Sequence, residues 1–472
     1  MVSATETGST PIPGEFFAAI AAVPYSTEEI ARKQKSRDFY WYSPELRPIF
    51  DGLKADVVVT PRNEDDIVTT LKACYAFDIP LTVRGAGTGN YGQAVPMKGG
   101  VVLDLSGMTA LKWVKPGLCR VEAGKKISDL DEELQAEGQE LRLFPSTKRM
   151  ATIGGFIAGG SGGVGAVTWG LLRDRGNVVA ARVLTMEAEP RVLELRGDEI
   201  NKVNHGYGTN GIITELEIAL APAYEWVDTG VVFDDLMQAA AFGEALTGSP
   251  GILKKICTVI AAPVPQQYFG TFGKLVPDGK HLCITMIAPQ AKDAFADLVE
   301  EHGGEVVYSR TAGEVQAARD LPIYEYCWNH TTMHALRSDR NITYLQTLFP
   351  PDNLLPMVEK TAQHFGDEVP MHLEFVRMGD KIACMGIQLV RYTTSERLRE
   401  IMDYLDAQGC QQFNPHAYSL EEGGMKEVDH LQRAFKEEAD PKGLLNPGKM
   451  LAWENPDWKP EGNKVYLYSS AG

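Results

Sequence analysis

The pattern of apolar and polar residues predicts an alternation of strands and helices over most of the chain. Residues 14–37 fit one or two helices. Residues 55–83 (ADVVVTPRNEDDIVTTLKACYAFDIPLTV) consist of an apolar run, a turn at Pro61, a helical pattern and a second apolar run. Asn63 stands just before the helical pattern, where its side chain can accept a hydrogen bond from the first turn as an N-cap. We therefore expect strand, helix and strand over this segment.

A glycine-rich segment separates two groups of predicted strands. Residues 151–170 contain so much glycine that we expect no regular element there, but a segment that wraps a ligand or packs backbone against backbone. Short apolar runs and alternating patterns predict strands on both sides of it, at residues 101–105, 119–122, 141–143, 178–186, 191–196 and 212–222.

The composition of the chain changes after Pro222. The following residues carry two rounds of helix and strand, from DDLMQAAAFGEAL to EVVYSR, and later the strand patterns EVPMHLEFV and KIACMGIQLV. We expect three parts: residues 1–222, a separate α+β unit at residues 223–426, and a C-terminal segment at residues 427–472 with a helix and a compact turn. The fold class that these patterns indicate is α+β.

Three matches to the pattern G-x-G-x-x-G raise the question of a nicotinamide nucleotide. They begin at Gly87, Gly160 and Gly206. In a Rossmann unit the third glycine opens a helix that crosses over to a parallel strand. Only residues 93–100, which include a proline and a Gly-Gly pair, separate Gly92 from the next predicted strand, so no crossover helix fits. We instead expect strand, glycine loop and strand, with backbone N–H groups that can bind an anion.

Charge and composition exclude several classes of function. The chain has 472 residues, 44% hydrophobic and 23% charged, with a formal net charge of −17. It can form two or three domains, but it would repel a phosphate backbone or an anionic lipid surface, so we expect neither nucleic acid nor membrane as a partner. The seven cysteines are scattered and have no C-x-x-C spacing, which favours a cytoplasmic protein. The sequence shows no basic and apolar leader and no run of about 18 apolar residues, so we expect no export signal and no integral membrane segment.

Five segments carry recognisable motifs in a fixed order. They are TPRNEDDIVTTLKAC (60–74), VRGAGTGNYGQ (83–93), FPSTKRMATIGGFIAGGSGG (144–163), GYGTNGIITELEIAL (206–220) and DPKGLLNPGKM (440–450). The first four resemble the FAD-binding domain of the PCMH-type, or vanillyl-alcohol oxidase, family of flavoproteins. The fifth is similar to the C-terminal signature of the D-lactate and glycolate dehydrogenase branch. The resemblance implies a two-subdomain FAD-binding domain, a separate α+β cap over it, and a C-terminal segment that returns to the FAD domain.

The resemblance also implies which residues would hold FAD. Two phosphates need several converging N–H donors, which backbone with few side chains can supply. The implied residues are Arg84, Gly85, Ala86, Gly87, Thr88, Gly89, Asn90 and Tyr91 at the pyrophosphate; Pro145, Ser146, Thr147, Gly154 and Gly155 at the isoalloxazine and ribityl groups; Gly162 at the phosphates; Gly208, Gly211 and Ile213 on the adenine side; and Asn446 and Lys449 at the flavin ring.

Two departures from the family pattern affect these expectations. Covalent members carry a histidine in the pyrophosphate loop, whereas residues 87–91 read Gly-Thr-Gly-Asn-Tyr, so the resemblance implies non-covalent FAD, with attachment through a cap His, Cys or Tyr as the alternative. In the D-lactate branch two histidines and a glutamate bind a metal, and here Arg377, Ala383 and Pro415 stand in their places. We therefore expect no metal site, which argues against D-lactate or D-2-hydroxyglutarate as the substrate.

A predicted helix over residues 324–334 carries two candidate histidines. His330 and His334 are four residues apart and would share one face of this helix. Three interpretations stay open: both are structural histidines with satisfied hydrogen bonds, His330 is catalytic or binds substrate, or the two bind a metal. No acidic residue has an obvious spacing that would complete a metal site.

Further candidates lie on two predicted strands. In residues 368–378, His372 and Glu374 would share one face, which either lines a pocket or faces water. Arg377 is a candidate carboxylate clamp, because its planar fork suits a bidentate partner. His416 and Tyr418 would alternate on a later strand. By resemblance His416 is the active-site histidine, and a neutral imidazole suits a base near pH 7.

Together these features imply an FAD-dependent dehydrogenase of a small hydroxylated molecule, with or without a carboxylate, in which His416 or His330 removes the hydroxyl proton. One alternative is an oxidase of an aromatic alcohol or phenol, suggested by Tyr324, Tyr326, Trp328 and Tyr418. Another is a flavin-binding electron-transfer subunit without its own substrate. The expected partners are a small-molecule substrate and an electron acceptor, such as oxygen, a quinone, a cytochrome or another protein. The oligomeric state stays open, with a homodimer among the alternatives.

Overall fold

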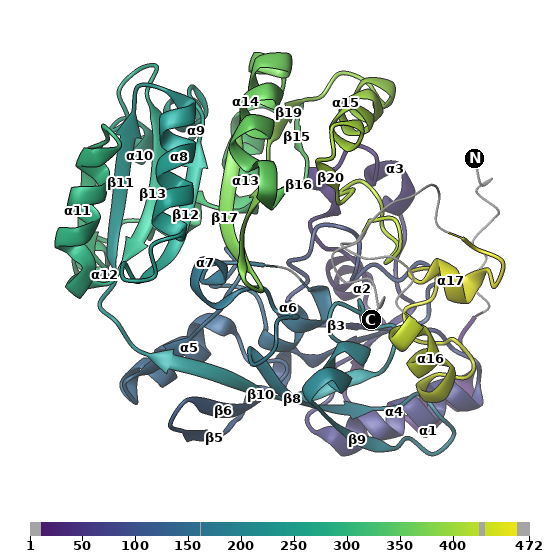
Figure 1. Cartoon of the computed structure of the whole chain (residues 1–472). Helices are drawn as coiled ribbons and strands as arrows, with labels where there is room; N and C mark the ends of the chain where they lie inside the picture. The colour runs from purple at the N-terminus through teal and green to yellow at the C-terminus, as the bar shows by residue number, and fades with distance from the viewer. Residues whose placement is uncertain (1–10, 161, 424–429, 460–472) are drawn as a thin grey trace.

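The computed structural model describes residues 11–160, 162–423 and 430–459 (Figure 1). Its first sheet has the order β1-β2-β4-β3 (Tyr25–Ser26, Val57–Val59, Val101–Asp104, Leu81–Arg84), with helices α1 (Gly14–Ala19), α2 (Glu29–Lys35), α3 (Arg47–Phe50) and α4 (Glu64–Ala76). Asn63 caps α4 as predicted, because its side chain accepts from the Asp66 N–H. Strands β3 and β4 pair in parallel although no helix joins them. The expected strand, loop and strand are confirmed.

The second sheet is built around the long strand β10. Its order is β5-β6-β10-β8-β9, and β7 also pairs with β10. The strands are β5 (Leu111–Lys115), β6 (Leu118–Glu122), β7 (Gln139–Leu141), β8 (Val178–Leu184), β9 (Val192–Arg196) and β10 (Ile212–Pro222), and the helices of this region are α5 (Ile127–Ala136), α6 (Ile153–Gly159) and α7 (Ala166–Trp169).

The third sheet lies above the other two in Figure 1. Its order is β14 (Glu305–Thr311), β11 (Val227–Phe233), β13 (His281–Ile287), β12 (Lys254–Ile260), β17 (His372–Met378), β18 (Lys381–Gly386), β16 (Thr347–Phe349) and β20 (Gln411–Gln412). Strands β15 (Ile342–Tyr344) and β19 (Leu389–Arg391) form a separate pair.

Helices accompany the third sheet and follow it in the chain. They are α8 (Leu236–Thr247), α9 (Val264–Tyr268), α10 (Gly270–Gly273), α11 (Lys292–Glu301), α12 (Ala312–Ala318), α13 (Asn329–Ser338), α14 (Leu354–Phe365), α15 (Ser395–Ala407), α16 (His430–Ala439) and α17 (Leu451–Glu454). None of the helices in the described ranges combines the length and the apolar character that crossing a membrane requires.

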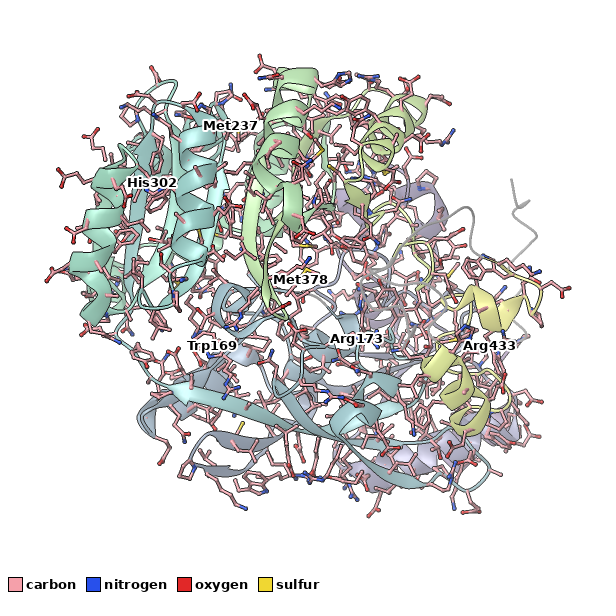
Figure 2. All side chains as sticks on the ribbon, in the orientation of Figure 1. Trp169, Arg173, Met237, His302, Met378 and Arg433 are labelled. Atoms are coloured by element: carbon pink, nitrogen blue, oxygen red, sulfur yellow. The ribbon has the colours of Figure 1, made fainter. Side chains whose placement is uncertain are left out.

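One hydrophobic core joins the second and third sheets. It contains Phe144 and Ile153 from the region of α6 together with Ile256 of β12 and Tyr326 before α13. A polar link crosses the same boundary. Lys255 Nζ of β12 donates to Glu140 Oε1 of β7 over 2.6 Å, and both side chains are 2% exposed. Trp169, labelled in Figure 2, lies at this junction, 5.7 Å from the Lys255 ammonium. The two sheets are thus held together by packing and by a buried ion pair.

The glycine-rich segment differs from expectation, because it contains helices α6 and α7. Thr152 caps α6 by accepting from the Gly155 N–H, and the helix buries Ile153, Phe156 and Ile157. Gly154 faces the backbone of Ala123, where an added Cβ would lie 2.8 Å from the carbonyl oxygen. The expectation of no regular element was wrong because glycine here permits close packing of a helix on the turn after β6, which outweighs its low helix propensity.

Two further expectations about local structure were also wrong. Residues 324–334 do not form one helix: a 3-10 turn (Ile323–Tyr326) ends before α13 begins, and Trp328 between them has a positive φ of 51°. His416 and Tyr418 do not alternate on a strand, because the described chain turns after β20. The His416 N–H instead bonds to the side chain of Asn414, a local contact that competes with strand pairing.

Candidate functional site

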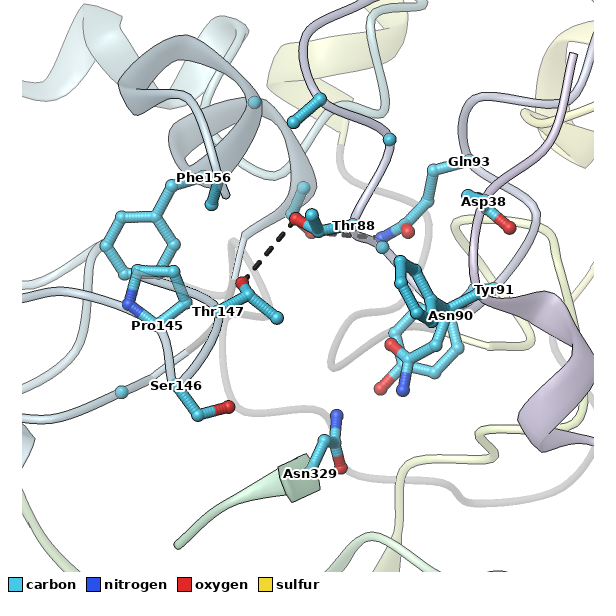
Figure 3. Close-up of a pocket in the computed structure, with 18 of the residues that line it drawn as sticks. Asp38, Thr88, Asn90, Tyr91, Gln93, Pro145, Ser146, Thr147, Phe156 and Asn329 are labelled. Carbon is cyan, nitrogen blue, oxygen red and sulfur yellow. Dashed lines mark hydrogen bonds between the residues drawn. The ribbon is translucent and has the colours of Figure 1, made fainter. Parts of the chain in front are cut away.

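A cavity of about 580 Å³ opens between the glycine loops of the first two sheets and the start of α13. Four segments supply most of its lining, around residues 83–94, 145–163, 205–208 and 325–337. Figure 3 shows its interior, where side chains of the first glycine loop face those of the segment before α6. Thr88 and Thr147 bridge the two walls, with their hydroxyl oxygens 3.5 Å apart. Segments far apart in the sequence therefore meet around one cavity.

Arg84 stabilises the conformation of the first glycine loop through hydrogen bonds to backbone carbonyl groups. Its guanidinium is buried and donates to the carbonyl oxygens of Lys35, Arg37 and Ala86, so it organises the loop from behind. Gly87 has φ +69°, and an added Cβ would lie 2.0 Å from Arg84 Nη2. Only glycine combines this conformation with this close approach. The loop thus brings its backbone close to the cavity at Gly87, between side chains such as Thr88 that also line it.

The opposite wall is the N-terminal end of α6. The cap residue Thr152 lies against Gly85, where a Cβ would approach the threonine hydroxyl to 1.9 Å. A narrow chamber of about 50 Å³ continues from this point and shares Thr152 and Gly85 with the larger cavity. Its remaining lining includes Gly154, Gly211 and Ile213. An elongated cavity walled by backbone, with a narrow extension, has the form that a dinucleotide requires.

A histidine and a carboxylate face the cavity from the third-sheet side. His330 and Glu325 both line it, and both are less than 8% exposed. His330 Nδ1 lies 2.7 Å from Glu325 Oε2, but the two groups are not aligned as a hydrogen bond. Two arginines, Arg149 and Arg337, also line the cavity, and Arg149 Nη1 lies 3.9 Å from Glu325 Oε1. This wall therefore combines a base with cationic groups.

Comparison with known proteins agrees with this geometry. Residues 55–194 match the family model described as an FAD binding domain, and the matched range contains both glycine walls of the cavity. This part of the chain carries the FAD-binding domain that the resemblance to the PCMH-type family predicted. Its fold as a whole resembles that of alkyldihydroxyacetonephosphate synthase, with a TM-score of 0.71 at 17% sequence identity over 95% of this chain and 87% of that chain.

Curated relatives that match part of the chain carry the names of oxidoreductases. A D-lactate dehydrogenase of Anaerostipes hadrus is 30% identical over 189 residues, which are 37% of this chain and 38% of the relative. Glycolate oxidase subunit GlcD of Bacillus subtilis is 28% identical over 212 residues, which are 42% of this chain and 44% of that protein. The chain thus matches less than half the length of these relatives.

Most residues implied for FAD lie at the cavity or its extension. The larger cavity is lined by Arg84 to Tyr91, Pro145, Ser146, Thr147, Gly155, Gly162 and Gly208, and the narrow chamber by Gly154, Gly155, Gly208, Gly211 and Ile213. Gly162, which the resemblance places at the phosphates, lies next to the Trp328 ring, and an added Cβ would be 2.7 Å from that ring. Most of the residues that the resemblance implies for FAD therefore line one cavity and its narrow extension.

Asn446 and Lys449 lie behind the residues that line the larger cavity. Asn446 Nδ2 donates to the carbonyl oxygens of Gln93 and Tyr207, and so ties the C-terminal segment to two lining segments. Lys449 is fully buried, its Nζ lies 4.3 Å from the Phe50 ring, and it has no hydrogen-bond partner among the described residues. Burial lowers the pKa of Lys449 to about 7.

Asp38 is the buried carboxyl group whose charge opposes the shift of Lys449. Asp38 lines the cavity and accepts from the backbone N–H groups of Tyr40 and Ala94. Burial raises the pKa of Asp38 to about 6. Tyr418 is half-buried beside these groups, packs on Phe50 and does not line the cavity. Burial thus shifts the pKa values of two ionisable groups, one in the cavity lining and one behind it, in the direction that disfavours their charged forms.

His416 lies outside the cavity lining and is already engaged. Its Nε2 lies 2.9 Å from the Tyr344 carbonyl oxygen, to which it can only donate, and its Nδ1 lies 2.8 Å from Ser43 Oγ. Burial lowers the pKa of His416 to about 4, so it is neutral at pH 7. The second histidine of α13, His334, is likewise turned away, with its ring stacked on Tyr326 and Nε2 at the Glu325 carbonyl oxygen. Neither histidine lines the cavity.

His372 and Arg377 have different surroundings. His372 is fully buried, and its Nε2 lies 2.8 Å from Glu374 Oε1, so the polar face of β17 neither meets water nor lines the cavity. Arg377 is exposed, and its Nε donates to the Gly379 carbonyl oxygen. Among residues 11–160, 162–423 and 430–459, no group of three or more His, Cys, Asp or Glu side chains could hold a metal ion.

Several lining residues were not singled out from the sequence. Glu325 precedes His330 by five residues, a spacing that no helical pattern pairs, and the backbone reversal at Trp328 brings the two together. Asp38 lies directly before the aromatic residues 39–42, and no motif of the sequence marks it. The sequence could have indicated Arg149, because this residue lies in the FPSTKRM segment between two predicted FAD contacts.

Proposed function

We propose that the protein is an FAD-dependent oxidoreductase that removes a hydride from the C–H of a small hydroxylated substrate, with His330 as the base. The observation that supports this most directly is the contact between His330 and Glu325 on the cavity wall opposite the glycine loops. Bound FAD supplies the two-electron acceptor that no side chain can provide. The relatives named D-lactate dehydrogenase and glycolate oxidase favour a CH–OH group as the reacting centre.

In this proposal each wall residue has a separate task. The imidazole of His330 accepts the hydroxyl proton as the hydride leaves, and Glu325 orients the ring and balances the positive charge that develops on it. Arg149 and Arg337 favour an anionic group on the substrate, because they are the cations of this wall in a chain with a net charge of −17. A carboxylated substrate is therefore the version we favour.

FAD is proposed to bind without a covalent bond. The loop from Gly85 to Tyr91 contains no histidine or cysteine, and its fold is stabilised by Arg84 rather than by a ligand bond. Acid or heat denaturation should release the flavin into the supernatant. If the colour stays with the precipitated protein, a covalent bond exists and this part of the proposal fails. A colourless protein that binds no added FAD would contradict the whole proposal.

The decisive test is flavin reduction under anaerobic conditions. Hydroxy acids, alcohols, amines and phenols are mixed with the FAD-loaded protein, and the loss of flavin absorbance is followed. We expect bleaching by one or more hydroxy acids, and a rate that falls about 10²- to 10⁴-fold in His330→Ala. The matched control is His334→Ala, which removes a histidine of the same helix that is turned away from the cavity. Equal loss in both variants would contradict the role of His330.

A second candidate is an oxidase of an aromatic alcohol or phenol. It is favoured by the aromatic part of the lining, which includes Phe39, Tyr42, Phe156 and Trp328. Bleaching by phenols but not by hydroxy acids, followed by rapid reoxidation in air, would establish it.

The name of the GlcD relative describes a subunit, which favours a third candidate, a flavin-binding electron-transfer subunit. Bleaching by any substrate would exclude this candidate, and reoxidation by oxygen, a quinone or a cytochrome would identify the acceptor.

A further inference from the structure

Trp328 has a backbone conformation that is unusual for a residue with a side chain. Its φ and ψ are +51° and −144°, a combination that is essentially confined to glycine. The residue lies between the turn that carries Glu325 and the first turn of α13, which carries His330. This reversal brings the two side chains to 2.7 Å. Strain at such a position persists only when surrounding contacts impose it.

The contact that imposes it comes from Glu374. The Trp328 N–H donates to Glu374 Oε1 over 2.6 Å, and the Thr258 hydroxyl donates to Glu374 Oε2 over 2.6 Å. His372 Nε2 lies 2.8 Å from Oε1, while its Nδ1 lies 3.1 Å from the Ile387 carbonyl oxygen, to which it can only donate. Glu374 is 1% exposed and His372 0%. The carboxylate is therefore fixed from several sides, and it can hold the Trp328 backbone in turn.

The Trp328 ring forms part of the cavity wall. It faces Gly162 of the FAD domain, where an added Cβ would lie 2.7 Å from the ring, and both residues line the cavity. The ring thus approaches the glycine segment as closely as a side chain can. Movement of residue 328 would shift the ring, the first turn of α13 and His330 together, because they are consecutive in the chain.

We propose that Glu374 is a positioning residue for the reaction proposed above. By accepting from the Trp328 N–H it imposes the left-handed conformation at residue 328, sets the Trp328 ring against Gly162 as one wall of the substrate site, and directs His330 towards Glu325. The inference rests on the proposed function for its catalytic consequence. The placement of the ring does not depend on that function and can be measured without a substrate.

The first experiment measures the accessibility of the Trp328 ring in the full chain. The chain has seven tryptophans, so acrylamide quenching of Trp328 is obtained as the difference between each protein and its Trp328→Phe counterpart. We expect Glu374→Ala to raise the quenching constant of Trp328 at least about twofold, and Glu374→Gln, which keeps an oxygen acceptor for the Trp328 N–H, to restore most of the original value. An unchanged constant in a folded Glu374→Ala protein would overturn the proposal.

A second variant covers the case in which Glu374→Ala does not fold. Thr258→Val keeps the volume at Thr258 but removes one donor to the carboxylate, and it should raise the quenching in the same direction by a smaller factor. No change in this variant, combined with a normal melting temperature, would also count against the proposal.

The second experiment follows flavin reduction with whichever substrate bleaches the protein. Glu374→Ala should lower the reduction rate about 10²-fold, because small misplacements of a base have effects of this size, and Glu374→Gln should recover most of it. A loss that Gln does not rescue would assign Glu374 a merely structural role. If no substrate reduces the flavin, the proposed function fails, while the quenching experiment still decides the positioning of Trp328.

Discussion

At the scale of single residues, burial decides which ionisable groups can act in this protein. His330 lines the cavity, whereas His416 is enclosed between Ser43 and the Tyr344 carbonyl group. The sequence favoured His416 through the family resemblance, but it could not show that both ring nitrogens already have partners. The glycines of the FAD loops could be predicted, because their pattern follows from the backbone geometry that a pyrophosphate needs. The pair of His330 and Glu325 could not, because it depends on the conformation of Trp328.

The pKa of His416 gives a testable dependence of stability on pH. Burial lowers it from 6.5 to about 4, so between these values the unfolded chain binds a proton that the folded protein does not. The free energy of unfolding is therefore highest above about pH 6.5 and falls as the pH is lowered towards 4. At pH 5 the loss is about 2 kcal/mol. Urea unfolding of the protein and of His416→Gln at pH 7 and pH 5 measures this, and the contribution of Asp38 cancels in the difference. Equal pH dependence in both proteins would contradict it.

Gly87 provides a second prediction at this scale. Gly87→Ala should weaken FAD binding at least about tenfold, or about 1.4 kcal/mol, because the added Cβ would meet Arg84 and strain the loop. Gly117→Ala is the matched control, since Gly117 also has a positive φ, of 78°, but no atom lies within 4 Å of the added Cβ. Titration of the apoprotein with FAD compares the two. Similar affinities would show that the loop does not touch the cofactor.

At the scale of elements, helix α6 shows where a sequence pattern fails. The dense glycines suggested irregular structure, because the pattern contains no information about what packs on them. The structure shows that Gly154 contacts the Ala123 backbone and that Gly155 donates its N–H to the cap residue Thr152. By contrast, most strands on both sides were predicted from their apolar or alternating residues, although β5 was missed and β7 begins two residues earlier than expected. Close backbone packing has no such periodicity.

The cap of α6 can be tested separately from its glycines. Thr152→Val removes the hydroxyl that accepts from the Gly155 N–H, and we expect a loss of about 1 kcal/mol in stability and weaker FAD binding, because the end of the helix forms a cavity wall. Thr152→Ser keeps the hydroxyl and should behave almost like the original protein. Thermal unfolding and FAD titration give both quantities. A Ser variant as impaired as the Val variant would assign the effect to the methyl group instead.

At the scale of the whole molecule, the ion pair of Lys255 and Glu140 connects the second sheet to the third sheet. Lys255→Met should destabilise the protein by about 3–5 kcal/mol, because it leaves the Glu140 carboxylate buried without its cation. The double variant Lys255→Met with Glu140→Gln should recover part of this loss, since the new amide oxygen can still accept from the Trp226 indole N–H, which bonds to the Glu140 carboxylate in the original protein. Urea unfolding measures both. Additive losses would show that the two charges are not coupled.

The C-terminal segment has a consequence for the order in which the protein is made. Strand β3 lies at the edge of its sheet, and the Leu81 N–H donates to the Leu444 carbonyl oxygen, while the Asn446 N–H donates to that of Leu81. The strand that leads into the first glycine loop is therefore completed by residues that the ribosome adds long after the strand itself. A nascent chain on the ribosome carries this edge unpaired, which exposes it to aggregation. Flavin loading should accordingly follow the synthesis of Leu444 and Asn446, and a chain ended after residue 423 should be made without flavin.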